Sequence, residues 1–175
     1  MKTRVALTLS IALIFGLVSV ANAQLKAGSP EDEAFKKIEA EKNPDARLAL
    51  LLDFEKQFAT TNGKTLASIY LMTMDIYSAK NNNAKTSEYG DKAIAKDPDN
   101  VSALLRVSRN YSAEKTNLAR AVEYAEKAKT LIGTMRSQPA PTGQSEADWK
   151  KWLDDNATSA DQYAQYAKML QSLQR

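Results

Sequence analysis

Two pairs of adjacent carboxylates, Glu31-Asp32 and Asp154-Asp155, are the residues whose types could perform acid–base chemistry. A catalytic carboxylate needs burial or a close charged neighbour that moves its pKa toward the working pH. Adjacent acids at a helix start or in a polar turn are more typical of helix caps and solvated surfaces. We therefore predict that neither pair is catalytic.

The side chains that most metal and nucleophile sites require are missing from the sequence. It has no histidine and no cysteine, so zinc, haem and copper sites and histidine-based triads lack their usual residues. It has no glycine-rich phosphate loop, and the run Asn81-Asn82-Asn83 is typical of a turn. We predict no catalytic residue, no metal site and no cofactor.

Two tryptophans are candidates for an interaction site. Trp149 and Trp152 lie three residues apart, which places both rings on one side of a helix. They could anchor a protein interface, where tryptophan is enriched, or they could cover the open end of a helical core. We favour the covering role, and Tyr163 and Tyr166 allow the same two interpretations.

The first 23 residues have the pattern of a secretory signal peptide. Two basic residues precede an uncharged apolar stretch at residues 5–20, and Ala21-Asn22-Ala23 resembles a cleavage site. We predict cleavage after Ala23, a periplasmic or secreted location, and no membrane attachment afterwards. Because the apolar stretch approaches the length that spans a bilayer, retention as a membrane anchor is the alternative.

The charge balance offers no attraction for nucleic acid. The chain has 24 Lys and Arg residues against 21 Asp and Glu residues, and loss of Lys2 and Arg4 with the signal peptide lowers the formal net charge from +3 to +1. A near-neutral surface with both signs interspersed does not concentrate phosphate groups. We therefore predict no nucleic-acid partner.

The residues above must be positioned by helices, because helical periodicity runs through residues 31–175 after a polar lead at residues 24–30. Apolar residues recur at spacings of three and four, and no stretch shows the alternation of a strand. We predict an all-α domain. Its helices begin near residues 31, 44, 65, 84, 101 and 118, followed by a short helix from residue 145 that holds both tryptophans and a last helix at residues 159–173.

Start and stop signals divide this helical pattern. Ser29-Pro30 and Asn43-Pro44 combine a capping residue with a proline in the first turn, and Ser145 begins a capping box. Pro98 separates two helices, and Asp99 or Asn100 can cap the second of them. The predicted helix ends are at Asn62-Gly63 and at Gly133.

One phrase of the sequence recurs a helical hairpin later. The segment SEYGDKAIAKDPDN at residues 87–100 returns in part as VEYAEKAKTLIG at residues 122–133. A period of this length is typical of a repeated pair of helices. The equivalent residues, 34 or 35 apart, are Tyr77 and Tyr111, Tyr89 and Tyr124, and Ala93 and Ala128.

This unit resembles the tetratricopeptide repeat family, whose 34-residue pattern is W-x2-L-G-x2-Y, then A-x3-F and then P. The chain departs from that pattern at Met74, Gly90, Ala125 and Gly133. The resemblance covers residues 67–133, with a more degenerate pair at 31–66 and capping helices at 145–175. An ordinary helical bundle with a chance period is the alternative. The first-helix matches are Tyr70-x2-Thr73-Met74-x2-Tyr77 and Leu104-x2-Val107-Ser108-x2-Tyr111.

The resemblance implies antiparallel helical hairpins stacked as a short right-handed solenoid, whose concave groove holds an extended peptide or a partner's helix. The short stack also suggests self-association through its ends. The residues implied to pack the repeats together are Tyr77, Ala93, Pro98, Tyr111, Ala121 and Ala128. Those implied to line the partner-binding groove are Ser68, Leu71, Asp75, Ser78, Ser102, Leu105, Arg109 and Ser112.

We therefore expect a non-enzymatic scaffold that binds a protein or peptide partner in the periplasm, in the assembly or tethering of an envelope complex. A helical, glutamate-dependent peptidoglycan-cleaving enzyme and a small-molecule carrier with its ligand between repeats are the alternatives. Within the groove, Asp75 and Arg109 either contact the partner or form a solvated face, paired with each other.

Overall fold

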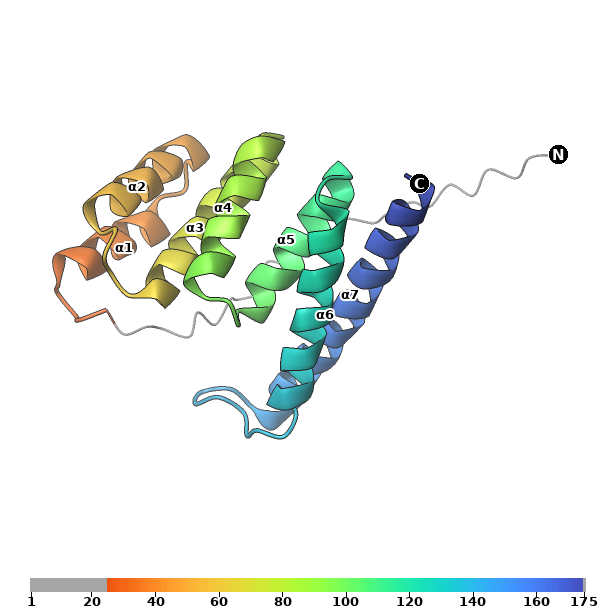
Figure 1. The fold of residues 1–175 in the computed structure, drawn as a ribbon. Helices are drawn as coiled ribbons and strands as arrows, with labels where there is room; N and C mark the ends of the chain where they lie inside the picture. Colours follow the sequence, from red (N-terminus) through yellow and green to blue (C-terminus); the bar gives the residue numbers. More distant parts are fainter. Residues whose placement is uncertain (1–24, 175) are drawn as a thin grey trace.

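The computed structural model describes residues 25–174, which form seven α-helices and no strand (Figure 1). This confirms the predicted all-α fold. The predicted signal peptide at residues 1–23 lies outside the described residues. No helix within residues 25–174 has the length and apolar character needed to span a bilayer. The helices are α1 (Pro30–Ala40), α2 (Pro44–Gln57), α3 (Gly63–Ala79), α4 (Asn83–Lys96), α5 (Val101–Glu114), α6 (Leu118–Met135) and α7 (Glu146–Leu173).

Polar side chains begin six of these helices. A serine or asparagine oxygen accepts a backbone N–H from the first turn, which satisfies a donor that the helix itself leaves unpaired. Asn117, before α6, makes no such bond and adopts a left-handed conformation. The caps predicted at the starts of α1, α2, α5 and α7 are confirmed. The six capping residues are Ser29, Asn43, Asn62, Asn82, Asn100 and Ser145.

Two predicted helix ends are wrong. Asn62-Gly63 begins α3 rather than ending α2, because the Asn62 side chain accepts the N–H of Lys64 at 2.8 Å. Gly63 also lies against the end of α4, where an added Cβ would come within 2.8 Å of the Lys96 carbonyl oxygen. Gly133 lies inside α6, which continues to Met135. Glycine tolerates a helix interior at a modest cost, so its presence alone does not end a helix.

The two helices predicted within residues 145–173 are a single helix of 28 residues, α7. The polar run at residues 156–159 contains neither glycine nor proline to end it. Its side chains bond to the backbone of their own helix: Thr158 and Ser159 each donate to the carbonyl oxygen four residues earlier, at 2.9 Å. The polar run is therefore accommodated within one continuous helix.

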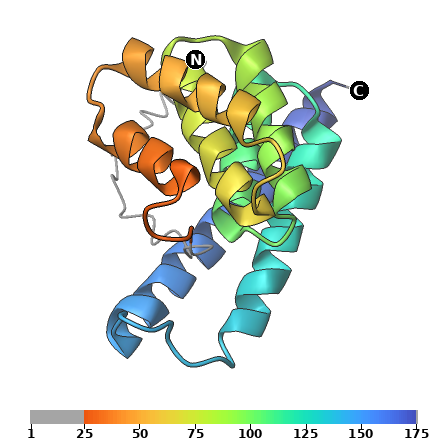
Figure 2. The ribbon, with the colours of Figure 1, turned by 90° about the vertical axis from the view of Figure 1, so that its left-hand side faces the viewer.

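Figure 1 shows that the helices follow one another in chain order, from α1 at one end to α7 at the other, and Figure 2 shows the row from the α1 end. Each helix packs against the next along the chain, and α7 also contacts α5. One hydrophobic cluster extends from Ile38 of α1 to Ala167 of α7. The core is therefore continuous along the row of helices, and it fixes the faces on which functional side chains lie.

Candidate functional site

The eight residues of the predicted groove all lie on α3 and α5, but at different depths. Leu71 and Leu105 are only 5% exposed and Ser112 only 1%, so the predicted apolar floor is buried. Ser112 donates to the Ser108 carbonyl oxygen within α5. The five that remain accessible are Asp75, Ser78 and Arg109, which are exposed, and Ser68 and Ser102, which are partly buried.

An ion pair crosses from α3 to α5 on this accessible surface. Asp75 pairs with Arg106, not with Arg109, the pairing considered from the sequence. Arg106 lies one helical turn before Arg109 and is partly buried, whereas Arg109 is exposed. Arg106 is therefore the arginine that reaches Asp75 of α3. Within the described residues, Arg109 forms no salt bridge. Its guanidinium group can therefore donate hydrogen bonds to a carboxylate of a partner.

A cluster of four side chains connects α2 to the hairpin of α3 and α4. Tyr89 of α4 stacks on Tyr77 of α3, with ring centroids 5.6 Å apart, and donates its hydroxyl to Glu55 of α2 at 2.9 Å. Lys92 pairs with Glu55 at 3.0 Å and lies 4.3 Å from the Tyr89 ring centre. We call Glu55, Tyr77, Tyr89 and Lys92 the α2–α4 linkage.

An equivalent cluster connects α4 to the hairpin of α5 and α6. Tyr124 of α6 stacks on Tyr111 of α5, with centroids 6.4 Å apart, and donates its hydroxyl to Asp91 of α4 at 3.4 Å. Arg120 pairs with Asp91 at 2.8 Å and lies 5.2 Å from the Tyr124 ring centre. These four residues form the α4–α6 linkage, which repeats the first one hairpin later.

The protonation states in the α2–α4 linkage suit structure rather than catalysis. Burial raises the pKa of Tyr89, and the Glu55 carboxylate raises it further, so the phenol remains neutral. Burial lowers the pKa of Lys92, but hydrogen bonds to Glu55 and Glu88 outweigh that effect and hold its pKa above the usual value. A lysine nucleophile needs a lowered pKa, so Lys92 is held in its unreactive charged form.

The residues predicted to pack the repeats together are mostly deep in the core. Tyr77 is partly buried, whereas Pro98 lies exposed in the turn between α4 and α5. Sequence reasoning missed the charged members of the two linkages, because Lys92 and Arg120 do not share the period of the tyrosines. The fully buried members of the predicted set are Ala93, Tyr111, Ala121 and Ala128.

Three of the four carboxylates singled out in the sequence form surface ion pairs, and within residues 25–174 Glu31 forms none. Lys36 lowers the pKa of Asp32 by a hydrogen bond, and the Gly28 N–H lowers it further. Asp154 pairs with Arg136 at 2.7 Å, and Asp155 pairs with Lys151 at 2.5 Å. Asp32 lies beside a cation, and Asp154 and Asp155 are exposed, so neither pair has the burial that sets the pKa of a general acid.

Glu114 is a carboxylate whose pKa is raised in the fold. Burial against α4 raises its pKa, and hydrogen bonds from the Ser87 and Thr116 hydroxyls partly offset this. The Ser87 Oγ donates to its carboxylate at 3.2 Å. Glu114 lies at the C-terminal end of α5, apart from the accessible residues of the groove.

We expect Glu114→Gln to raise the melting temperature at neutral pH, and the gain to shrink as the pH falls. A raised folded-state pKa means that the protonated form fits the fold better, so the charged form costs stability above that pKa. Thermal melts between neutral pH and about pH 4 measure this difference. Glu39→Gln removes the same charge from an exposed site and is the control; a gain that does not vary with pH would contradict the assignment.

The two tryptophans stack on each other near the start of α7. Their ring centroids are 5.0 Å apart at an interplanar angle of 10°, and both rings pack against the hydrophobic core. This placement agrees with the covering role. Tyr163 also packs against the core, whereas Tyr166 is 44% exposed.

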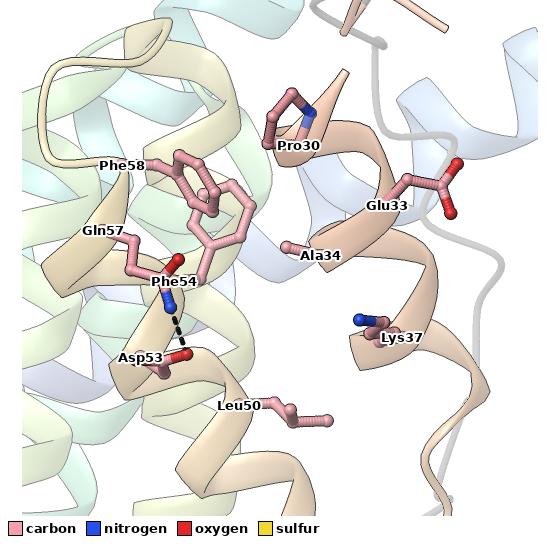
Figure 3. A pocket seen from close by; sticks show the side chains of 9 residues that line it. All are labelled: Pro30, Glu33, Ala34, Lys37, Leu50, Asp53, Phe54, Gln57 and Phe58. Atoms are coloured by element: carbon pink, nitrogen blue, oxygen red, sulfur yellow. Dashed lines mark hydrogen bonds between the residues drawn. The ribbon is translucent and has the colours of Figure 1, made fainter. Parts of the chain in front are cut away.

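A pocket of about 320 Å³ lies between α1 and α2 (Figure 3). The Phe54 and Phe58 rings, 4.8 Å apart, form part of its wall. Asp53 and Gln57 of α2 bond to each other at its edge. A pocket of this size can take a side chain of a bound protein or a small ligand. Its other lining residues are Pro30, Glu33, Ala34, Lys37 and Leu50.

Within residues 25–174, no three Asp or Glu side chains gather in a way that would hold a metal ion. The accessible residues of the predicted groove lie on α3 and α5, next to the ion pair of Asp75 and Arg106. Searches of family models, curated proteins and solved structures found no match to the chain.

Proposed function

We propose that the chain is a non-enzymatic protein–protein interaction module of the tetratricopeptide type, exported to the periplasm, where it helps to assemble or tether an envelope complex. The observation that carries this proposal is the pair of equivalent linkages, α2–α4 and α4–α6. Each ties the second helix of one hairpin to the second helix of the next through a tyrosine, a cation and a carboxylate.

Equivalent linkages support a repeat because each hairpin of a solenoid must meet the next in the same way. Tyr89 and Tyr124 are 35 residues apart and are 5% and 6% exposed, so the sequence period coincides with a repeated packing role. A chance period in a helical bundle gives no reason for such equivalence. In the proposed right-handed stack, α3 and α5 are first helices and present their accessible residues on the concave side.

The proposed groove is polar and has both signs of charge. Asp75 and Arg106 hold α3 and α5 together across it, and Arg109 presents a guanidinium group without a carboxylate partner among the described residues. Ser68 and Ser102 offer hydrogen bonds without bulk. We propose an extended protein segment as the partner, with a carboxylate against Arg109. The buried Leu71 and Leu105 support the helices and do not contact the partner.

The proposal is tested by affinity capture from an envelope extract, with the chain as recovered from the periplasm of expressing cells. Intact mass should show that it begins at Gln24. We expect one protein to be enriched with the wild type, and its affinity to fall roughly tenfold or more with Arg109→Glu, because charge reversal opposes a carboxylate.

Lys150→Glu is the matched control, since it makes the same charge change on the exposed surface of α7. It should retain the partner at wild-type affinity. Equal capture by all three chains would exclude the groove. Turnover of peptidoglycan that a single Asp or Glu substitution abolishes would support the enzyme alternative, and a small molecule retained through purification would support the carrier, with the α1–α2 pocket as its site.

A further inference from the structure

The C-terminal half of α7 bears a row of apolar side chains that no other described helix covers. Tyr166, Met169 and Leu173 are 44%, 49% and 74% exposed, and with Leu52 they are the exposed large hydrophobic residues of the described chain. Their spacing of three and four places them on one face of the helix. Tyr163, one turn before Tyr166, packs against the core but is still partly accessible at the end of this row. We call these four residues the α7 stripe.

The α7 stripe has no charged residue on it. Between residues 162 and 174 the only ionisable side chain other than the tyrosines is that of Lys168, which pairs with Glu126 of α6 at 2.8 Å. Two turns earlier, Asp161 pairs with Lys129 of α6 at 2.6 Å. Both charges therefore point toward α6, away from the exposed face. Depletion of charge together with tyrosine and methionine is the composition of interface cores.

The order of the side chains would let the stripe pack against the stripe of a second copy that runs in the opposite direction. Its N-terminal half is aromatic and its C-terminal half is aliphatic. A second copy packed antiparallel and centred near residue 168 would place Tyr166 beside Met169 and Tyr163 beside Leu173. Each contact would then occur twice, as two-fold symmetry requires, and sulfur–aromatic contacts are favourable. We infer that α7 packs against α7 of a second copy in an antiparallel, two-fold symmetric dimer.

Other partners fit this stripe less well. A lipid surface binds helices that have lysine or arginine beside the apolar face, and between residues 162 and 174 the one such residue, Lys168, pairs with Glu126. A charged peptide would find no complementary charge on it. The stripe is about 15 Å long, counted at 1.5 Å per residue over ten residues. An interface of that length is smaller than those of stable dimers, so the dimer should form and separate with concentration.

The dimer is tested by sedimentation equilibrium of the purified, exported chain. We expect the mass of the wild type to rise from monomer toward dimer with concentration, and Met169→Glu to remain monomeric because its carboxylate would be buried against tyrosine. Leu52→Glu is the control, because it places the same charge at an exposed leucine on α2 and should dimerise like the wild type. A wild type that stays monomeric at about 1 mM would overturn the inference.

The antiparallel register is tested with single cysteines, since the chain has none of its own. A mixture of Tyr166→Cys and Met169→Cys chains should form a disulfide between unlike chains, in a buffer of oxidised glutathione, faster than either chain mixed with Leu52→Cys. Equal rates in all mixtures would exclude this register. The result is independent of the groove on α3 and α5, because neither variant alters that surface.

Discussion

Replacing Tyr111 with alanine is expected to lower the free energy of unfolding by about 3–5 kcal/mol, as for other fully buried aromatic residues. Tyr111 is 0% exposed and is the largest fully buried side chain of the described residues. It stacks on Tyr124, so its loss leaves a cavity and removes one wall of the α4–α6 linkage. Urea denaturation followed by circular dichroism measures the change.

Tyr111→Phe separates the ring from its hydroxyl. Among the described residues the buried Tyr111 hydroxyl has no partner at hydrogen-bonding geometry, although Asp91 is close enough to raise its pKa, so its removal should change the free energy of unfolding by less than about 1 kcal/mol. Tyr89→Phe, in contrast, loses the bond to Glu55 and should cost about 1–2 kcal/mol. Equal losses of unfolding free energy in Tyr111→Phe and Tyr89→Phe would contradict the prediction that only the Tyr89 hydroxyl makes a stabilising hydrogen bond.

Replacing Gly90 with alanine is expected to lower the free energy of unfolding by about 1–3 kcal/mol, although alanine favours helix more than glycine does. Gly90 lies where α3, α4 and α5 meet. An added Cβ would come within 2.7 Å of Val107 Cγ2 and 3.2 Å of Met74 Sδ. Val107 has a stiff branched side chain in a filled core and cannot move away without strain.

Gly133→Ala is the matched control, because it makes the same substitution in a helix where no atom lies near the added Cβ. Here the helix preference acts alone and should raise the free energy of unfolding by about 0.5–1 kcal/mol. Urea denaturation of both variants tests whether the free energy of unfolding falls in Gly90→Ala and rises in Gly133→Ala. A gain in both would mean that Gly90 is not a close-packing position.

The starts of α1, α2, α5 and α7 could be predicted because helix capping depends on local chemistry. A serine or asparagine before each of these helices accepts a backbone N–H of the first turn, whereas Asn117 before α6 does not. Tyr89 and Tyr124, 35 residues apart, each stack on a tyrosine of the preceding helix. The end of a helix was harder to predict. Gly133 has open space around it, and the polar run at residues 156–159 bonds to its own backbone, so neither interrupts its helix.

The depth of the groove residues could not be predicted from the sequence. Helical spacing places Leu71, Asp75, Leu105 and Arg109 on their helices, but exposure depends on how closely the neighbouring helices approach. The two leucines are covered, and the two charged residues are not. The roles of Lys92 and Arg120 in the linkages could not be predicted either, because a long side chain can reach an equivalent carboxylate from different positions along its helix.

The attachment of α1 has a consequence for local stability. This helix packs mainly against α2, and Ile38 is its single buried residue. By contrast α5 has nine buried residues and meets α4, α6 and α7. Opening of α1 alone therefore exposes little apolar surface and costs a small part of the free energy of global unfolding. The α1–α2 pocket is thus bounded on one side by a helix with a single buried residue, and we expect amide hydrogen exchange in α1 to be faster than in α5.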